Sequence, residues 1–142
     1  MKILLLNGVN LNMLGKRNPH HYGTQTLAEL EQSVVAYAAK KGADVVCMQS
    51  NVEGQLVNIL QTTDCDAVIL NAGAYSHYSY ALRDCIECID IPVVEVHLSN
   101  IYEREAFRHV DVLEEVCAGR FYGKGVNSYY EAVDFVVSIC KL

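Results

Sequence analysis

The sequence predicts an α/β fold in which helices cover both faces of a parallel sheet. Short apolar runs alternate along the chain with segments whose apolar residues recur at helical spacing. The runs are mostly continuous, which is typical of strands buried on both faces. Strands that alternate with helices are joined by right-handed crossovers and so run parallel. With 142 residues, the chain fits a single domain over residues 1–142.

The first strand is predicted over residues 2–6, and a long polar loop follows it as far as residue 24. Loops of this length in compact domains are usually lids or binding loops. Thr26 and Glu29 have the spacing of a capping box and predict the start of a helix that Gly42 ends. Its apolar face is formed by Leu27, Leu30, Val34 and Tyr37.

The second and third strands are predicted over residues 43–48 and 67–70. Ser50 and Glu53 repeat the capping-box spacing and predict a helix between these strands. Another helix follows the third strand. The apolar faces of these two helices are Leu56, Ile59 and Leu60, then Ala81, Leu82, Cys85, Ile86 and Ile89.

The fourth strand begins at Val93 and ends at His97. Residues 103–108 allow at most two helical turns before a fifth strand over residues 116–121. Ser128 and Glu131 predict the cap of a last helix, with Ala132, Val133, Val136, Val137 and Cys140 on its apolar face. These elements predict a flavodoxin-like three-layer sandwich whose five-stranded parallel sheet has the order 2-1-3-4-5.

Polar side chains follow three of the predicted strands, at the edge where such sheets bind ligands. Arg17 and Tyr22 lie on the long loop above this edge. We therefore expect a binding site there. The polar residues after the strands are Asn7 and Asn10, then Asn71 and His77, then His97, Ser99 and Asn100.

Composition limits the partners. The net charge of -6 argues against nucleic acid, because phosphate backbones are bound by clustered Lys and Arg. The N-terminal run MKILLLNG is too short for a signal peptide or a membrane span, so we expect a cytoplasmic protein with no membrane partner. Six cysteines are then expected to be reduced thiols. Cys85 and Cys88 leave open a redox or zinc protein, although no second such pair accompanies them.

Three common ligand motifs of this fold are absent from the sequence. A dinucleotide fingerprint needs GxGxxG after the first strand, where this chain has GVNLNMLG. A P-loop needs Ser or Thr after Gly-Lys, and here Arg17 follows. A phosphorylated receiver needs acidic residues after the first strand, where this chain has asparagines.

The remaining polar residues suggest acid–base chemistry. Glu95 and His97 share one face of a strand, and a carboxylate beside an imidazole raises the imidazole's pKa and fixes its tautomer. A neutral phenol is a poor base, and Arg17, five residues before Tyr22, favours the phenolate. Each feature also has a simpler interpretation: a solvated Glu95 on an edge strand, an exposed Tyr22 on a loop tip, and an Arg108 paired on the surface with Glu105 or Asp111.

Taken together, a phenolate base and a protonated imidazole in one pocket suit a stepwise elimination. The base removes a proton next to a carbonyl, an enolate forms, and the acid protonates the leaving hydroxyl. Arg108, the Asn71 amide and the Leu98–Ser99 backbone would hold a carboxylate and hydroxyl groups.

Four stretches resemble the type II 3-dehydroquinate dehydratases in order and spacing: NGVNLNMLGKRNPHHYG, QSNVEG, NAGAYSHYSYALRD and PVVEVHLSNIYEREAFRH. The resemblance covers most of the chain. It implies anti dehydration of 3-dehydroquinate to 3-dehydroshikimate, with no cofactor and no metal, and the same flavodoxin-like fold.

The resemblance also implies a role for each matching residue. Tyr22 is the base with Arg17 as its activator, His97 is the acid with Glu95 as its orienting partner, and Asn10 stabilises the enolate through a water. It implies substrate contacts from Asn71, His77, Leu98, Ser99 and Arg108. It implies a homo-oligomer of trimers grouped into dodecamers, in which Asp84 reaches a neighbouring subunit's site.

The segment over residues 110–125 departs from the family pattern of small and apolar residues. It contains Asp111, Glu114, Glu115 and Arg120. An arginine in a buried strand either pairs with an acid or points to a neighbouring subunit. The departure leaves open a different class of protein, a non-catalytic module that binds a hydroxy acid or joins other chains.

Overall fold

A computed structural model describes residues 1–141 and confirms the predicted sheet. All five strands are parallel, and their order is β2-β1-β3-β4-β5. The strands are β1 (Lys2–Asn7), β2 (Asp44–Gln49), β3 (Ala67–Asn71), β4 (Val93–His97) and β5 (Gly119–Tyr122).

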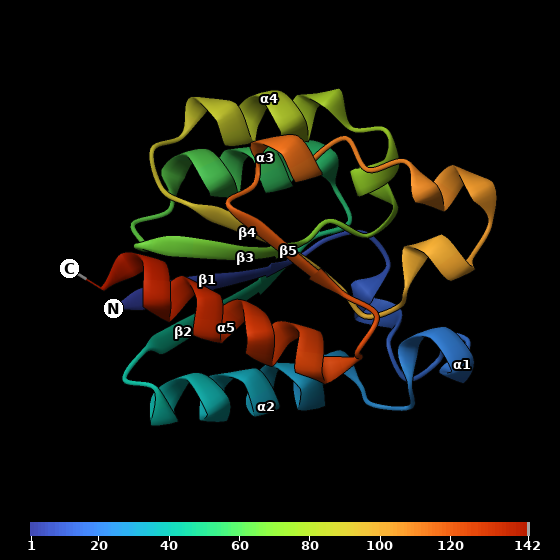
Figure 1. The fold of residues 1–142 in the computed structure, drawn as a ribbon, viewed down its shortest axis with the longest axis horizontal. Helices are drawn as coiled ribbons and strands as arrows, with labels where there is room; N and C mark the ends of the chain where they lie inside the picture. The colour runs from blue at the N-terminus through green and yellow to red at the C-terminus, as the bar shows by residue number, and fades with distance from the viewer. Residues whose placement is uncertain (142) are drawn as a thin grey trace.

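Two helices cover each face of the sheet (Figure 1). α2 (Leu27–Lys40) and α5 (Val126–Cys140) lie on one face, and α3 (Glu53–Thr62) and α4 (Tyr80–Cys88) on the other. A four-residue helix, α1 (Pro19–Tyr22), lies beyond the carboxyl ends of the strands. Short 3-10 turns complete the connections: Leu11–Met13, Gly73–His77, Ile101–Glu103, Ala106–His109 and Glu114–Val116.

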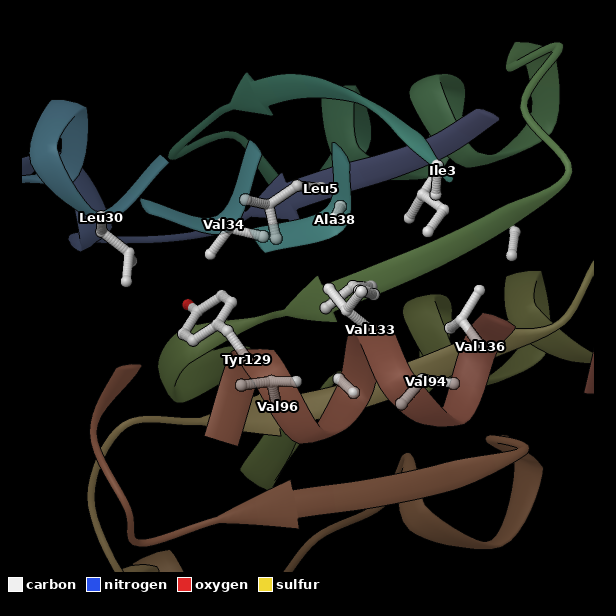
Figure 2. Packing of buried hydrophobic residues seen from close by; sticks show 14 of the residues in the cluster. Ile3, Leu5, Leu30, Val34, Ala38, Val94, Val96, Tyr129, Val133 and Val136 are labelled. Carbon is white, nitrogen blue, oxygen red and sulfur yellow. The ribbon is translucent and has the colours of Figure 1, made fainter. Parts of the chain in front are cut away.

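The strands separate two apolar cores because their side chains alternate between the faces. Ile3 and Leu5 of β1 pack on the α2–α5 side, where Val133 of α5 approaches the sheet (Figure 2). Leu4 and Leu6 pack on the α3–α4 side. In β4, Val94 and Val96 join the first core, whereas Val93 joins the second, so Glu95 and His97 share the second face as predicted.

One of the three predicted capping boxes forms. The Thr26 side chain accepts from the Glu29 N–H at 3.2 Å, and the Glu29 carboxylate accepts from the Thr26 N–H at 3.3 Å. The box predicted at Ser50 and Glu53 is wrong, because α3 begins after Val52 and the Glu53 carboxylate instead accepts from Ser79 Oγ.

The third box, predicted at Ser128 and Glu131, is also wrong. α5 begins after Gly125, so Ser128 lies inside the helix and is fully buried. Its Oγ accepts from the Lys124 N–H at 3.0 Å. The hydroxyl therefore stabilises the turn before the helix instead of capping it.

The chain between β4 and α5 also differs from expectation. The fifth strand starts at Gly119 and ends at Tyr122, three residues later than predicted at its start and one at its end. Glu114–Val116 forms a 3-10 turn, which lets Val116 pack against the second core. The predicted turns over residues 103–108 are two separate 3-10 turns.

Two glycines let the segments after β1 and β3 approach each other. A Cβ at Gly8 would lie 2.8 Å from the carbonyl oxygen of Ala72. A Cβ at Gly73 would lie 2.6 Å from the carbonyl oxygen of Val9, and Gly73 has a φ of +62°. No larger residue fits either position without moving the backbone.

Over residues 1–141, all six cysteines are free thiols, as predicted, and Cys85 and Cys88 both lie in α4. Within the same residues, no helix has the length and apolarity needed to cross a membrane.

Candidate active site

A small pocket lies at the carboxyl ends of β3 and β4. It has a volume of about 30 Å³ and brings together most of the predicted site residues. Leu98 and Ser99 contribute to its wall. The other polar residues that line it are Arg17, Tyr22, Asn71, His77, His97, Arg104 and Arg108.

Tyr22 receives hydrogen bonds from two arginines. Arg17 Nη2 donates to Tyr22 Oη at 2.7 Å, and the Arg17 guanidinium lies 3.6 Å from the centre of the phenol ring. Arg104 Nη1 donates to the same oxygen at 2.5 Å. Two guanidinium groups therefore direct N–H donors at the same phenol oxygen. The predicted pairing of Arg17 with Tyr22 is confirmed as a contact.

His97 lies deep in the pocket against Glu95. Its Nε2 is 2.6 Å from Glu95 Oε2, and Glu95 is completely buried. The predicted contact is confirmed, but the predicted pKa effect is wrong. Burial lowers the pKa of His97, because an imidazolium is poorly stabilised away from water, and the charge of Asp111 opposes this shift only in part.

The pKa of Glu95 moves in the opposite direction. Burial raises it, and the carboxyl group of Asp111 raises it further. A carboxyl that keeps its proton supplies no negative charge to His97. Burial thus shifts the pKa values of both groups toward their neutral forms.

His77 and Arg108 form the opposite part of the pocket. His77 Nδ1 lies 2.7 Å from the carbonyl oxygen of Val110, and its ring stacks on His97 with centres 6.4 Å apart. Burial lowers the pKa of His77. Arg108 reaches Glu105 at 3.3 Å, which is one of the surface pairings left open, and it also lines the pocket.

Asn71 is fixed by a buried polar chain. Its Nδ2 donates to Tyr129 Oη at 2.8 Å, and Tyr129 Oη donates to Asn7 Oδ1 at 2.7 Å. Asn71 Oδ1 accepts from the Gly73 N–H at 3.0 Å. α5 thus holds the carboxamide at the end of β3 in one orientation.

Three predicted site residues do not line this pocket: Glu95, which lies behind His97, and Asn10 and Asp84. Asn10 is exposed, adopts a left-handed conformation with φ of +67°, and donates its N–H to Asn51 Oδ1. Asp84 lies on α4, on the α3–α4 side of the sheet, and lines neither this pocket nor two other cavities of the described chain.

Sequence reasoning missed Arg104, Tyr129 and Asp111. Arg104 is 82 residues from Tyr22, so only the folded chain brings them together. Tyr129 could have been found from the sequence, because a tyrosine in the apolar stripe of a helix needs a buried hydrogen-bond partner for its hydroxyl. Asp111 was considered only as a departure from the family pattern and as a possible surface partner of Arg108.

Glu95, His97 and Asp111 are the group of possible metal ligands found in residues 1–141, with donor atoms within 4.8 Å of one another. Two ligands at about 2.1 Å from a tetrahedral ion would lie about 3.4 Å apart. The 2.6 Å between His97 and Glu95 is a hydrogen-bond length instead. The geometry favours a proton over a metal ion.

A larger cavity of about 410 Å³ also contacts Tyr22, Leu98 and Ser99. His20, His21 and Gln25 line it from α1 and the following loop. Tyr22 and the end of β4 are thus shared by a tight polar pocket and a roomier neighbouring space.

Comparison with known proteins gives one consistent family. The family model described as dehydroquinase class II matches residues 1–137. A 3-dehydroquinate dehydratase from Pelotomaculum thermopropionicum is 50% identical over 94% of this chain and 94% of its own. Another from Leptothrix cholodnii is 46% identical over 98% of this chain and 95% of its own.

Solved structures agree with the sequence relatives. The type II dehydroquinase from Butyrivibrio crossotus has a TM-score of 0.92 at 42% identity, covering 96% of this chain and 97% of that one. The type II dehydroquinase from Propionibacterium acnes has a TM-score of 0.91 at 36% identity, covering 96% of each chain. On its matching sequence and its shared architecture, this chain belongs to the class II dehydroquinase family.

Proposed function

We propose that this protein is a hydro-lyase that dehydrates 3-dehydroquinate to 3-dehydroshikimate. The observation that carries the proposal is one pocket in which Tyr22, under two guanidinium groups, faces an imidazole backed by a carboxyl group. Named relatives that share about half of its residues are 3-dehydroquinate dehydratases.

In the proposed reaction, the Tyr22 phenolate removes the proton next to the substrate carbonyl. The electron pair moves into the carbonyl and gives an enolate, which Asn10 stabilises through a water. The enolate then expels the hydroxyl on the opposite face as His97 gives it a proton, and water leaves. Tyr22 is the base, His97 is the acid, and no cofactor takes part.

In this scheme, two arginines act on Tyr22 and a third binds the substrate. Arg17 and Arg104 stabilise the phenolate before the first step. Arg108 binds the substrate carboxylate, while Asn71, His77, Leu98 and Ser99 position its hydroxyl groups. The bound carboxylate also adds negative charge near His97, which favours the imidazolium that the second step requires.

A direct assay tests this function. The purified protein is incubated with 3-dehydroquinate, and the conjugated enone of the product is followed by ultraviolet absorbance. We expect catalytic turnover. No absorbance change at high protein concentration would contradict the proposal. If calorimetry then showed tight binding of dehydroquinate, a binding module would be favoured.

We also propose that the protein works as a homo-oligomer built from trimers and grouped into dodecamers. Asp84 lines neither the pocket nor two other cavities of its own chain, which supports its assignment to a neighbouring subunit's site. Exposed apolar side chains such as Val46 and Met48 on the edge strand β2 are available for subunit contacts.

A further inference from the structure

We propose that Glu95 and Asp111 share one proton in the resting protein, and that Asp111, held by Arg120, is a positioning residue that sets the protonation of His97. The second clause rests on the proposed function, in which His97 is the acid. The first clause concerns the protein without substrate and stands on geometry.

Glu95 has one oxygen that needs a hydrogen. Its Oε2 lies against His97 Nε2, but its Oε1 is buried and accepts no hydrogen bond from the described residues. Buried polar atoms are almost always paired. The carboxyl group of Asp111 is close to that of Glu95, with an oxygen of each within 4.8 Å of the other. Two ionised carboxylates cannot hydrogen-bond each other, so a proton between them is the pairing that satisfies Oε1.

The surroundings of Asp111 suit it to accept the hydrogen bond from Glu95. Its side chain is only 1% exposed, and its Oδ1 accepts from the Leu113 N–H at 2.9 Å and the Glu114 N–H at 3.2 Å. Its Oδ2 accepts from Arg120 Nη1 at 3.1 Å. All three groups donate to Asp111 oxygens, which leaves the Asp111 carboxyl group as the acceptor in its pairing with Glu95. The shared proton therefore belongs mainly to Glu95.

Arg120 balances the cluster from the neighbouring strand. β4 and β5 pair with Glu95 opposite Arg120, which explains why an arginine occupies this half-buried edge strand. The Arg120 side chain is 10% exposed and also reaches Tyr102 Oη at 2.8 Å and Glu114 at 3.2 Å. The predicted pairing of Arg120 with an acid is confirmed.

The other charges near the cluster are few. Glu114 follows the Asp111 turn, and its charge raises the pKa of Glu95. His77 faces His97 from the turn after β3, and its charge lowers the pKa of His97. The charges of Glu95 and Asp111 raise the pKa of the Cys117 thiol. Burial raises the pKa of Glu95 and lowers that of His97. Both effects place the proton on the carboxyl pair when no substrate is bound.

The protons lost and gained by the cluster balance over one proposed turnover. The cluster holds one ionisable proton, which sits on Glu95 at rest and must be on His97 for catalysis. His97 passes it to the leaving hydroxyl, which departs as water, and Glu95 then remains a carboxylate. The proton that Tyr22 removed from the substrate leaves to solvent, and one proton from solvent restores the cluster.

Asp111 and Arg120 then have opposite effects on the pH at which the cluster loses its last proton. The Asp111 charge holds the proton to higher pH, and the Arg120 charge releases it at lower pH. A structural ion pair would not produce opposite shifts, because losing either partner would destabilise the same contact.

The first experiment measures the alkaline limb of kcat/KM against pH. We expect Asp111→Asn to move this limb down by about one pH unit and Arg120→Met to move it up by about one unit. The double variant should return it close to that of the unmodified protein. Asp64→Asn, which removes an exposed acid paired with Lys2, should leave it unchanged. A limb that neither single variant moves overturns the positioning role.

The second experiment needs no turnover, and its decisive measurement is made on the unmodified protein. We expect the infrared spectrum of the substrate-free protein near pH 7 to show the carbonyl band of a buried protonated carboxyl. The band should be lost in Glu95→Gln and kept in Asp64→Asn. Its absence from the unmodified protein overturns the shared proton even if the enzyme is active. Its presence in a protein that never turns over would instead refute the proposed function alone.

Discussion

At the scale of single residues, Tyr22 differs from the other tyrosines in the donors it receives. Arg17 and Arg104 both donate to its oxygen, from the preceding loop and from the segment after β4. By contrast, Tyr37 Oη donates to the carboxylate of Asp134, which raises the pKa of Tyr37. The direction of these hydrogen bonds supports the proposal that Tyr22 acts as a base.

Tyr22→Phe should therefore lower kcat by about 10²–10⁴-fold, the usual contribution of a general base, with little change in substrate affinity. Stopped-flow or steady-state enone formation gives kcat, and calorimetry gives affinity. Tyr130→Phe, at a tyrosine stacked on Tyr37 on the helical face, serves as the matched control and should keep full activity. An equal loss of binding and turnover would mean that Tyr22 mainly holds the substrate.

Glu95 makes stability depend on pH. Burial raises its pKa above the unfolded value of about 4.3, so the native state keeps a proton that the unfolded chain has lost. Stability must then fall as pH rises between these two pKa values, by up to about 1.4 kcal/mol per pH unit. His97, whose pKa burial lowers, adds the opposite slope, but only below about pH 6.5.

We expect Glu95→Gln to remove that loss, because an amide donates to Asp111 and accepts from His97 without a proton to lose. The free energy of unfolding is measured in urea at pH 7, 8 and 9, and the difference between the variant and the unmodified protein should increase in favour of the variant as pH rises. The activity of the unmodified protein should fall over the same pH range. Parallel pH dependence of the two proteins would show that Glu95 is ionised in the folded state.

Sequence reasoning found the local pairs of the site and missed the distant ones. Arg17 and Tyr22 are five residues apart on one loop, and Glu95 and His97 are two apart on one strand, so chain geometry alone brings them together. Arg104 reaches Tyr22 only through the fold. The pKa of His97 was misjudged for a related reason, since complete burial of its carboxyl partner is a property of the packed sheet.

At the scale of elements, the segment over residues 15–23 behaves as a unit that closes the pocket. Gly15 and Gly23 flank it with φ values of +93° and +71°, and it carries Arg17 and Tyr22. The pocket holds about 30 Å³, far less than the roughly 300 Å³ or more of ordinary ligand sites. We therefore expect the segment to move outward when a substrate enters.

Limited trypsin digestion should report this motion. We expect cleavage after Lys16 or Arg17 in the free protein, and cleavage several-fold slower when Tyr22→Phe is saturated with 3-dehydroquinate, because bound substrate holds the segment closed. Casein digested under the same conditions controls for an effect of the ligand on trypsin. Equal cleavage rates with and without ligand would show that the segment stays closed.

The elements predicted well from the sequence are those that several residues specify independently. The strands and α2 are specified by several apolar residues together, and Thr26 caps a helix whose first turn agrees with it. Ser50 and Ser128 have the same spacing to a glutamate, but nearby groups bind their hydroxyls. The segment before β5 was mispredicted because Val116 packs on a core instead of extending a strand.

At the scale of the whole molecule, the proposed place of Asp84 in a neighbouring subunit's site can be tested by mixing subunits. Asp84→Asn and Tyr22→Phe each remove one part of a shared site. If the site takes Tyr22 from one chain and Asp84 from the next, coexpressed variants form some complete sites.

We expect each variant to be nearly inactive alone and the coexpressed mixture to recover a sizeable fraction of activity, with light scattering giving the assembly size. A mixture no more active than the average of its parts would place Asp84 and Tyr22 in the same subunit's site. Coexpressing Glu95→Gln with Tyr22→Phe is the matched control, because both residues belong to one pocket and no site can be complete.

The tight contact made by Gly8 and Gly73 has a consequence for any survey of essential positions. Neither residue carries a functional group, yet an alanine at either one would strike a carbonyl oxygen of the opposite loop and displace the ends of β1 and β3. An alanine scan scored by growth would therefore rank these two positions with the proton-transferring residues, although their contribution is only the space they leave empty.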